Sequence, residues 1–238
     1  YLVKKGRSLK IDLTPIVGDP FADNYLFQRL EYLQQVGATR ISFVTNAIGM
    51  SPVKVDRLLD FQLGYPGRLK MSVSIGGFDR ETYHKAFGVD SFDRVTSNLT
   101  YLVSRKMEIQ HGLPILINPR CHPDRMNGPF YDTLLKYAKE GWVEFSDVLT
   151  EYGNWGGKID EQAVRSLGLS LAPKPTRFSG PCSKLFFHGV VITNDGTVNA
   201  CACRDVEVTL PLGNLRDSSL EDILTGTKRR ALIDNMME

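Results

Sequence analysis

Residues 9–149 alternate between short β-branched or aromatic runs and longer runs with apolar residues at helical spacing. The strand-like runs lie at 9–16, 40–45, 69–75, 113–118 and 142–149, and the helix-like runs at 24–36, 51–61, 91–106 and 129–139. Each of the first four predicted strands is followed by a predicted helix, an order typical of parallel strands joined by right-handed crossovers. We therefore expect an α/β domain, and a barrel or partial barrel fits this repeat better than an open sheet.

Composition argues against several classes of protein. The chain has 238 residues, a net charge of +2, 42% hydrophobic residues and 24% charged residues, which are ordinary values for a soluble globular protein. Such a mild charge gives no reason to expect a nucleic-acid partner. No run approaches the roughly 18 consecutive apolar residues of a membrane span, and the first residues lack the apolar core of a signal peptide. We expect a cytoplasmic protein with neither a membrane nor a nucleic-acid partner.

Glycines and small polar residues gather where the predicted strands end. In parallel α/β folds these carboxyl ends meet at one edge of the sheet and carry the ligand site. The residues at or near these ends are Gly18, Asp19, Pro20, Thr45, Asn46, Ser72, Ser74 and Arg120, and Asn154 follows a further strand-like segment. They include no Ser/His/Asp arrangement and no paired carboxylates, so we predict a site for a polar small molecule and name no catalytic residue. Taken one loop at a time, these segments also fit ordinary βα loops.

In their order, the segments LTPIVGDPFAD, ISFVTNAIGMS and SVSIGGFDRETYHKAFG resemble the radical S-adenosylmethionine (SAM) enzymes. In that family a G-G-[ED]-P stretch holds the amino group of SAM, and Val17-Gly18-Asp19-Pro20 is similar. Thr45-Asn46-Ala47 stands where the family has T-N-G, and Ser74 matches a serine near the SAM carboxylate or ribose. The SAM-binding residues that this resemblance implies are Gly18, Asp19, Pro20, Thr45, Asn46, Ser72, Ser74, Arg120 as a substitute carboxylate contact, and Asn154 near the adenine.

Three of the four cysteines lie in one segment, PCSKLFFHGVVITNDGTVNACACRD, at positions 182, 201 and 203. Its β-branched run and the Asn194-Asp195-Gly196 triplet predict a β-hairpin that brings Cys182 near Cys201. Cys203 shares the strand parity of Cys201, so both thiols are expected to face one side. Thiolates suit iron–sulfur clusters, and the alternatives are buried structural thiols or a zinc ion completed by an outside ligand.

With the following PLGNLRDSSLEDIL, this segment resembles the SPASM or twitch extension of radical SAM enzymes, a hairpin plus helix that carries an auxiliary iron–sulfur cluster. The resemblance implies Cys182, Cys201 and Cys203 as metal ligands. It also implies two regions, 1–175 as a partial barrel and 176–238 as an incomplete auxiliary-cluster region. The expected fold is therefore a partial (β/α)6 TIM-like barrel without its first strand, followed by a small β-hairpin and helix.

The radical SAM family is defined by C-x-x-x-C-x-x-C, and this sequence contains no such triad. We expect the triad and the first barrel strand upstream of Tyr1, and further cluster cysteines after Glu238. We expect the chain alone to be inactive and to bind SAM weakly. The resemblance implies that the intact enzyme uses a [4Fe–4S] cluster and SAM to generate a 5′-deoxyadenosyl radical. That radical would modify a peptide, a sugar or another organic substrate, with flavodoxin or ferredoxin as electron donor.

Two other interpretations remain open. One is a degenerate radical-SAM-like binding module that lacks the catalytic cluster. The other is a metal-independent barrel enzyme such as an aldolase or hydrolase, for which Asp147 and Glu151 are the nearest acidic candidates. Cys121 is expected to be a plain loop thiol, and the scattered histidines at 84, 111 and 188 are expected to be structural.

Overall fold

The structure is a computed structural model that carries side chains. It describes residues 8–14, 16, 18–147, 149–153, 158–173, 182–186, 189–201, 203 and 205–237. No helix in these ranges is long and apolar enough to cross a membrane.

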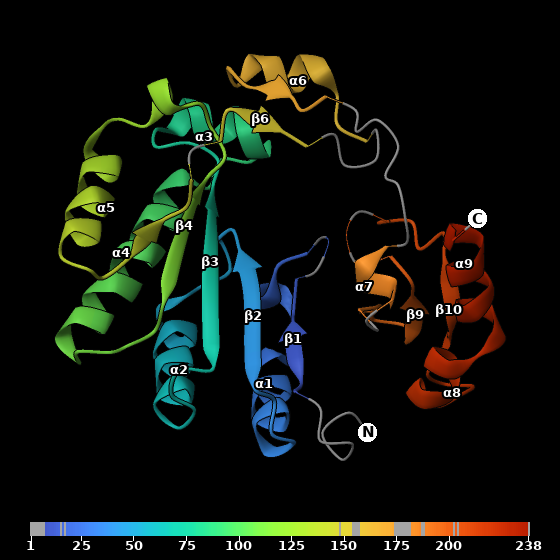
Figure 1. The fold of residues 1–238 in the computed structure, drawn as a ribbon. Coiled ribbons are helices and arrows are strands. Elements are labelled where there is room, and N and C mark those ends of the chain that lie inside the picture. Colours follow the sequence, from blue (N-terminus) through green and yellow to red (C-terminus); the bar gives the residue numbers. More distant parts are fainter. Residues whose placement is uncertain are drawn as a thin grey trace.

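A five-stranded parallel sheet forms the centre of the N-terminal part (Figure 1). Its strands lie in chain order: β1 (Lys10–Asp12), β2 (Arg40–Thr45), β3 (Leu69–Ile75), β4 (Ile115–Pro119) and β5 (Glu144–Phe145). Every neighbouring pair is parallel. The predicted α/β class and the parallel pairing are therefore confirmed.

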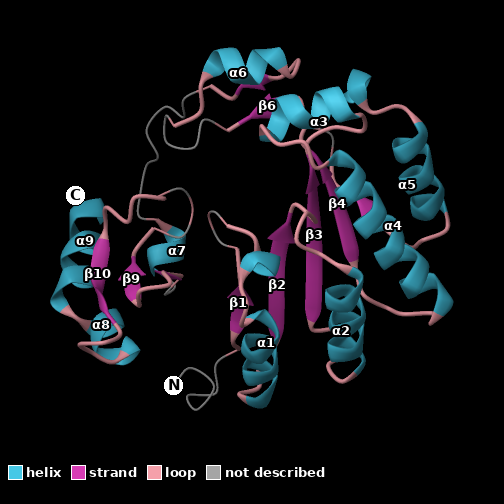
Figure 2. Cartoon of the chain, turned by 180° about the vertical axis from the view of Figure 1, so that it is seen from behind, coloured by secondary structure: helices cyan, strands magenta, loops and turns pink. Residues whose placement is uncertain are grey.

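Helices cover one face of this sheet. The helices of the N-terminal part are α1 (Leu26–Gln35), α2 (Pro52–Leu63), α3 (Arg80–Phe87), α4 (Phe92–Glu108) and α5 (Pro129–Lys139), and its 3-10 turns are η2 (Pro20–Ala22) and η3 (Pro123–Arg125). Helices α1, α2 and α4 lie behind the sheet in Figure 1 and in front of it in Figure 2. Along β3, Met71 and Val73 are buried in the core under these helices, while Ser72 and Ser74 on the other face are only half-buried. One face of the sheet therefore packs into the core, and the other presents polar side chains.

The predicted partial (β/α)6 barrel is not confirmed, and the five-stranded sheet is not closed. β1 and β5 are its edges, and β6 (Glu151–Tyr152) pairs instead with β7 (Ser170–Leu171) in a separate two-stranded sheet beside α6 (Glu161–Ser166). The predicted strand 142–149 is reduced to two residues, since Trp142 closes the turn after α5 by donating its backbone N–H to the Tyr137 carbonyl. Its aromatic and β-branched composition reflects packing against the core rather than an extended strand.

Helix α3 has no counterpart among the predicted helices, although its end signals are present. The Asp79 side chain accepts from the Thr82 backbone N–H at 2.8 Å and caps the first turn. Gly88 ends the helix in the left-handed region, at φ 70°. The helix is short and polar, with only Thr82 and Tyr83 buried, so hydrophobic periodicity could not reveal it.

The C-terminal unit is a small antiparallel sheet with helices, more than the predicted hairpin and single helix. Its elements are α7 (Ser183–Phe186), β8 (Val191–Ile192), β9 (Thr197–Asn199), β10 (Pro211–Asn214), α8 (Leu220–Thr225) and α9 (Thr227–Met237), with strand order β10-β9-β8. It has its own core, which includes Leu185, Val198 and Ile223. The predicted boundary at 175/176 lies outside the described residues and stays a prediction.

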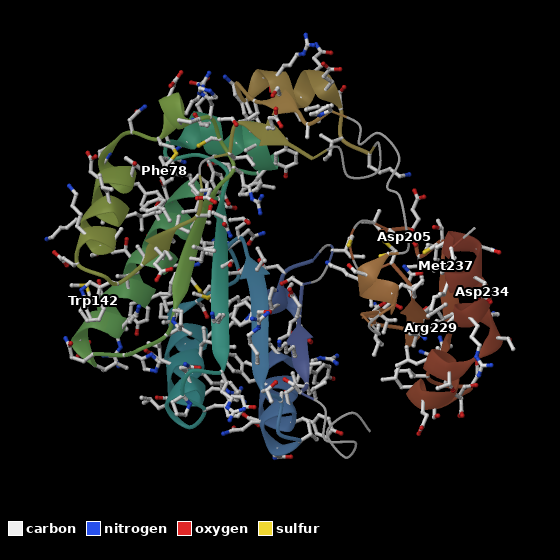
Figure 3. All side chains as sticks on the ribbon, viewed as in Figure 1. Phe78, Trp142, Asp205, Arg229, Asp234 and Met237 are labelled. Atoms are coloured by element: carbon white, nitrogen blue, oxygen red, sulfur yellow. The ribbon has the colours of Figure 1, made fainter. Side chains whose placement is uncertain are left out.

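A buried arginine joins the helices of this unit. Arg229 of α9, labelled in Figure 3, donates to the carbonyl of Leu185 in α7 at 2.8 Å and to that of Leu224 in α8 at 3.2 Å. These bonds fix α7, the helix that directly follows Cys182, to the C-terminal helices.

Candidate functional site

The Asp19 carboxylate joins the ends of β1 and β2. Its Oδ2 accepts from the Thr45 hydroxyl at 2.9 Å and from the Asn46 backbone N–H at 2.7 Å. Its Oδ1 accepts from the Phe21 backbone N–H at 2.9 Å and caps η2, and Pro20 occupies the first turn. A carboxylate has about four acceptor positions, so three are committed to the protein itself. Asp19, Thr45 and Asn46 are thus brought together, and Asp19 has a structural role in addition to the ligand role that the resemblance implies.

The loop after β2 is held in a strained conformation. Ala47 is fully buried and has φ 61°, the left-handed region that glycine tolerates and alanine does not favour. Its N–H donates to the Thr45 hydroxyl at 3.0 Å, and its carbonyl accepts from the Asn98 side chain at 2.8 Å. Position 47 therefore has the backbone conformation that glycine prefers, although the residue is alanine.

Asn98, which contacts this loop from α4, is a residue that our sequence predictions missed. It lies on α4 between Val95 and Leu99, on the buried face, whose other residues are apolar apart from Lys106. A buried amide on such a face must find hydrogen-bond partners, and Asn98 finds them in the carbonyls of Ala47 and Ile48. A polar residue inside an apolar helical stripe was the signal that could have identified it.

Ser74 and Arg120 form a second group, at the ends of β3 and β4. The guanidinium of Arg120 lies 3.5 Å from the Ser74 hydroxyl, and the Arg120 backbone N–H donates to the Ile75 carbonyl at 2.7 Å. Ser72 lies on the same half-buried face of β3 as Ser74. No hydrogen bond between described residues joins this group to Asp19, but both groups lie at the carboxyl end of the sheet.

A cavity of about 670 Å³ opens beside the Asp19 group. It is lined by Gly18, Asp19 and Pro20 from one side and by Lys184 and residues 190–194 from the C-terminal unit. Gly18 has φ 104°, so its backbone conformation favours glycine. Ser74 and Arg120 do not line this cavity, and Asn154 lies outside the described residues.

Gly76 and Gly77 serve packing. A Cβ atom at Gly76 would lie 2.8 Å from the Ala86 Cβ, and one at Gly77 would lie 2.6 Å from the Thr82 Cβ. Both glycines therefore allow α3 to approach the end of β3, which accounts for them without a ligand.

The predicted D-G turn of the C-terminal unit is confirmed. Gly196 has φ 88°, and the N–H of Thr193 donates to the carbonyl of Thr197 at 2.9 Å. Asp195 accepts from the Thr193 hydroxyl at 2.5 Å, which is the main cause that lowers the pKa of its carboxyl group, and its further bonds to Thr197 act in the same direction. This turn joins β8 to β9 and leads the chain toward Cys201.

Cys201 and Cys203 do not lie on a strand as predicted. Cys182 directly precedes the short helix α7, and Cys201 and Cys203 follow the last residue of β9. The strand-parity argument for Cys201 and Cys203 is therefore wrong, because neither residue lies in the ladder. Cys182 and Cys203 are exposed, Cys201 is half-buried, and none of the four cysteines is in a disulfide.

Shared packing brings the cysteine-bearing segments into one unit. Leu185 after Cys182 and Ala200 before Cys201 belong to the same small core. Among the described residues, no group of three or more Cys, His, Asp or Glu side chains is arranged to hold a metal ion. The donors fit an iron–sulfur cluster chemically, as soft thiols that solvent reaches, although the side chains as placed do not gather around one point.

Cys121, which was expected to be a plain loop thiol, and His111, which was expected to be structural, are both buried. Burial raises the pKa of the Cys121 thiol to about 11, so it is a poor nucleophile and metal ligand. His111 is buried between the Leu59 carbonyl and the Leu113 N–H. His84 is exposed on α3, and His188 lies outside the described residues. The acids named for a metal-independent enzyme, Asp147 and Glu151, are both exposed.

The C-terminal unit is similar to iron–sulfur cluster-binding domains. Residues 182–238 match the SPASM family, described as an iron–sulfur cluster-binding domain. The match begins at Cys182 and includes Cys201 and Cys203. A search of curated proteins found no match to the chain.

Proposed function

We propose that this chain is part of a radical SAM enzyme whose C-terminal unit holds an auxiliary iron–sulfur cluster. The observation that carries the proposal is the SPASM match over 182–238, since SPASM domains are typical of radical SAM enzymes. The three cysteines in that range, two exposed and one half-buried, supply the ligand chemistry. Cys182, Cys201 and Cys203 would hold the cluster.

The sheet supports the other half of the proposal. A parallel sheet covered by helices on one face leaves its other face for a ligand at the carboxyl ends of the strands. The Asp19–Thr45–Asn46 group and the Ser74–Arg120 pair lie at those ends. Arg120 supplies a cation that suits a carboxylate, such as that of SAM, and the serine adds a neutral hydrogen bond.

The residues of this chain would bind and orient. When bound, the clusters and SAM supply the one-electron chemistry that yields a 5′-deoxyadenosyl radical, with an electron donor such as flavodoxin or ferredoxin. Asp19 would keep the loops after β1 and β2 in place, and Ser74 and Arg120 would hold the polar end of the ligand. The substrate class that we propose is a peptide, a sugar or another small organic molecule.

Anaerobic reconstitution of the 238-residue chain tests the metal site. We expect iron to bind together with sulfide, and we expect Cys182→Ala and Cys201→Ala each to lose most of it. Cluster stability depends on each thiolate that is a ligand. Chemical assays would give the iron and sulfide content per chain. The visible absorption bands of the iron–sulfur cluster would report its formation.

Cys121→Ala is the matched control, because Cys121 is buried and far from the other cysteines in the chain. It should keep the iron content of the parent chain. The proposal fails if the parent chain takes up no iron–sulfur cluster, or if the iron content of the Cys182 and Cys201 variants equals that of Cys121→Ala. Zinc uptake without sulfide would favour the zinc alternative instead.

A further inference from the structure

The loop between β9 and β10 carries Cys201 and Cys203 and is organised by one acid. This acid is Asp205, which is labelled in the C-terminal unit in Figure 3. Cys201 and Cys203 lie outside the strands, so contacts from other residues must give their thiols a defined direction.

A single oxygen of Asp205 collects three donors. Its Oδ2 accepts from the Asn199 side-chain amide at 2.9 Å, the Thr209 backbone N–H at 2.8 Å and the Leu210 backbone N–H at 3.2 Å. Hydrogen bonds to an ionised carboxylate are stronger than those between neutral groups. The carboxylate therefore joins β9, through Asn199, to Thr209 and Leu210, the two residues directly before β10.

Asn199 extends this contact to the cysteine. The same amide nitrogen that reaches Asp205 lies 3.4 Å from the Cys201 carbonyl oxygen. Asn199 is fully buried on β9, so its side chain has little freedom to turn away. A path of hydrogen bonds thus runs from the Asp205 carboxylate through the Asn199 amide to the backbone of Cys201.

The strained backbone of the loop is held by the same residue. Val208 has φ 56°, which is unfavourable for a β-branched residue, and its N–H lies 3.4 Å from the Asp205 carbonyl. Such a conformation persists only where the surroundings over-determine it. Asp205 supplies both the backbone carbonyl and the side-chain carboxylate that do so.

We infer that Asp205 is a positioning residue for Cys201, acting through Asn199, and that it orders the backbone at Cys201 before any cluster binds. The functional part of this inference, the effect on a cluster, rests on the proposed function. The ordering itself does not, because every contact that carries it lies within the chain.

Two variants and one control test the inference on the full 238-residue chain. Asp205→Ala removes all three bonds, and Asp205→Asn keeps an acceptor oxygen without the charge, so it should restore part of the effect. Asp217→Asn is the control, an exposed acid that makes no side-chain hydrogen bond among the described residues. Circular dichroism of each variant checks that the unit is folded.

The metal-free readout is cysteine alkylation, mapped by mass spectrometry. In Asp205→Ala we expect alkylation of Cys201 to accelerate about tenfold, roughly the factor that one charge-assisted hydrogen bond corresponds to. Cys182, which is exposed and outside the loop, is the internal reference and should keep its rate. The inference is overturned if the Cys201 rate in both Asp205 variants equals that in Asp217→Asn.

The second readout is the electron paramagnetic resonance spectrum of the reconstituted, reduced chain. Asp205→Ala should change the cluster signal or lower the iron content, with Asp205→Asn between it and the parent. Should the parent hold no cluster, the proposed function fails while the alkylation rates still decide the role of Asp205. Should the parent hold a cluster whose signal is the same in both variants, Asp205 does not position a ligand.

Discussion

At the scale of single residues, the loop after β2 combines an unfavourable backbone conformation with several hydrogen bonds. Ala47 takes a left-handed backbone and is held by Thr45 and Asn98. The strain costs about 1–2 kcal/mol for a residue with a Cβ atom, and the surrounding hydrogen bonds must offset it. Strain of this kind gathers at ligand sites, which agrees with the role proposed for the neighbouring Asp19.

Replacement of Ala47 separates backbone strain from packing. In Ala47→Gly the strain is relieved by about 1–2 kcal/mol. That gain is opposed by about 0.8 kcal/mol for the buried methyl group and roughly 0.5–1 kcal/mol for chain entropy. We expect a free energy of unfolding within about 1 kcal/mol of the parent. Ala47→Val should lose about 2 kcal/mol or more, since a β-branched residue is poorly tolerated there and the site is full.

Chemical denaturation followed by tryptophan fluorescence measures both Ala47 variants. Ala38, which is also fully buried in the same core, offers a control outside the loop, and its Val variant reports overpacking alone. Equal losses for Ala38→Val and Ala47→Val would show that the backbone of Ala47 adds nothing.

At the scale of elements, the connection from α4 to β4 depends on a neutral histidine. His111 Nδ1 accepts from the Leu113 backbone N–H at 3.0 Å, so the ring proton lies on Nε2 and points to the Leu59 carbonyl, 3.1 Å away. Burial is the largest cause that lowers the pKa of His111 below 6.5, and the nearby Lys106 cation lowers this pKa further. The Leu59 carbonyl and the Asp60 carboxylate act in the opposite direction and only partly offset the fall. Protonation would break the bond from Leu113.

The stability of the sheet should therefore depend on pH through His111. Below pH 6.5 the unfolded chain binds a proton at this ring before the folded chain does, so the free energy of unfolding falls as the pH falls from 6.5 through the lowered pKa. His111→Gln, whose amide can still donate to Leu59, should be less stable at pH 7.5 but lose less on acidification. Thermal unfolding midpoints at pH 7.5 and 5.5 measure this difference. A parallel fall in parent and variant would exclude His111 as the cause.

At the scale of the whole molecule, two hydrophobic cores lie in different parts of the chain. The larger one joins the parallel sheet to α1, α2, α4 and α5, and the smaller one lies within the C-terminal unit. A unit with so small a core is marginal by itself, and small domains of this kind commonly depend on a metal or cluster for stability.

The separate cores predict separate effects of core mutations. Ile223→Ala should cost about 2–4 kcal/mol in the C-terminal unit. Both tryptophans, 142 and 155, precede this unit in the sequence, so tryptophan fluorescence reports mainly on the N-terminal part. We expect hydrogen exchange in 190–214 to accelerate while the fluorescence midpoint stays unchanged. Leu99→Ala, in the larger core, should lower the fluorescence midpoint and leave hydrogen exchange in 190–214 unchanged. An equal fall in fluorescence midpoint for both variants would mean that the two cores unfold together.

Much of the fold could be predicted because periodicity reports which face of an element is buried. The strand at 69–75 and the helix at 129–139 were predicted with the bounds that the structure has. The D-G turn was predictable as well, since few residues adopt the backbone that Gly196 requires. These features depend on residues close together in the chain, so local sequence patterns predict them.

What the patterns could not supply depends on contacts between distant residues. The strand predicted at 142–149 is only the two-residue strand β5, because Trp142 and Val143 pack onto the core. Cys203 lost its predicted strand position because the ladder of β9 ends at Asn199. The links from Asp19 to Thr45, from Asn98 to Ala47 and from Asp205 to Asn199 exist only after the chain has folded, since each depends on side chains that the tertiary structure alone brings within hydrogen-bond distance.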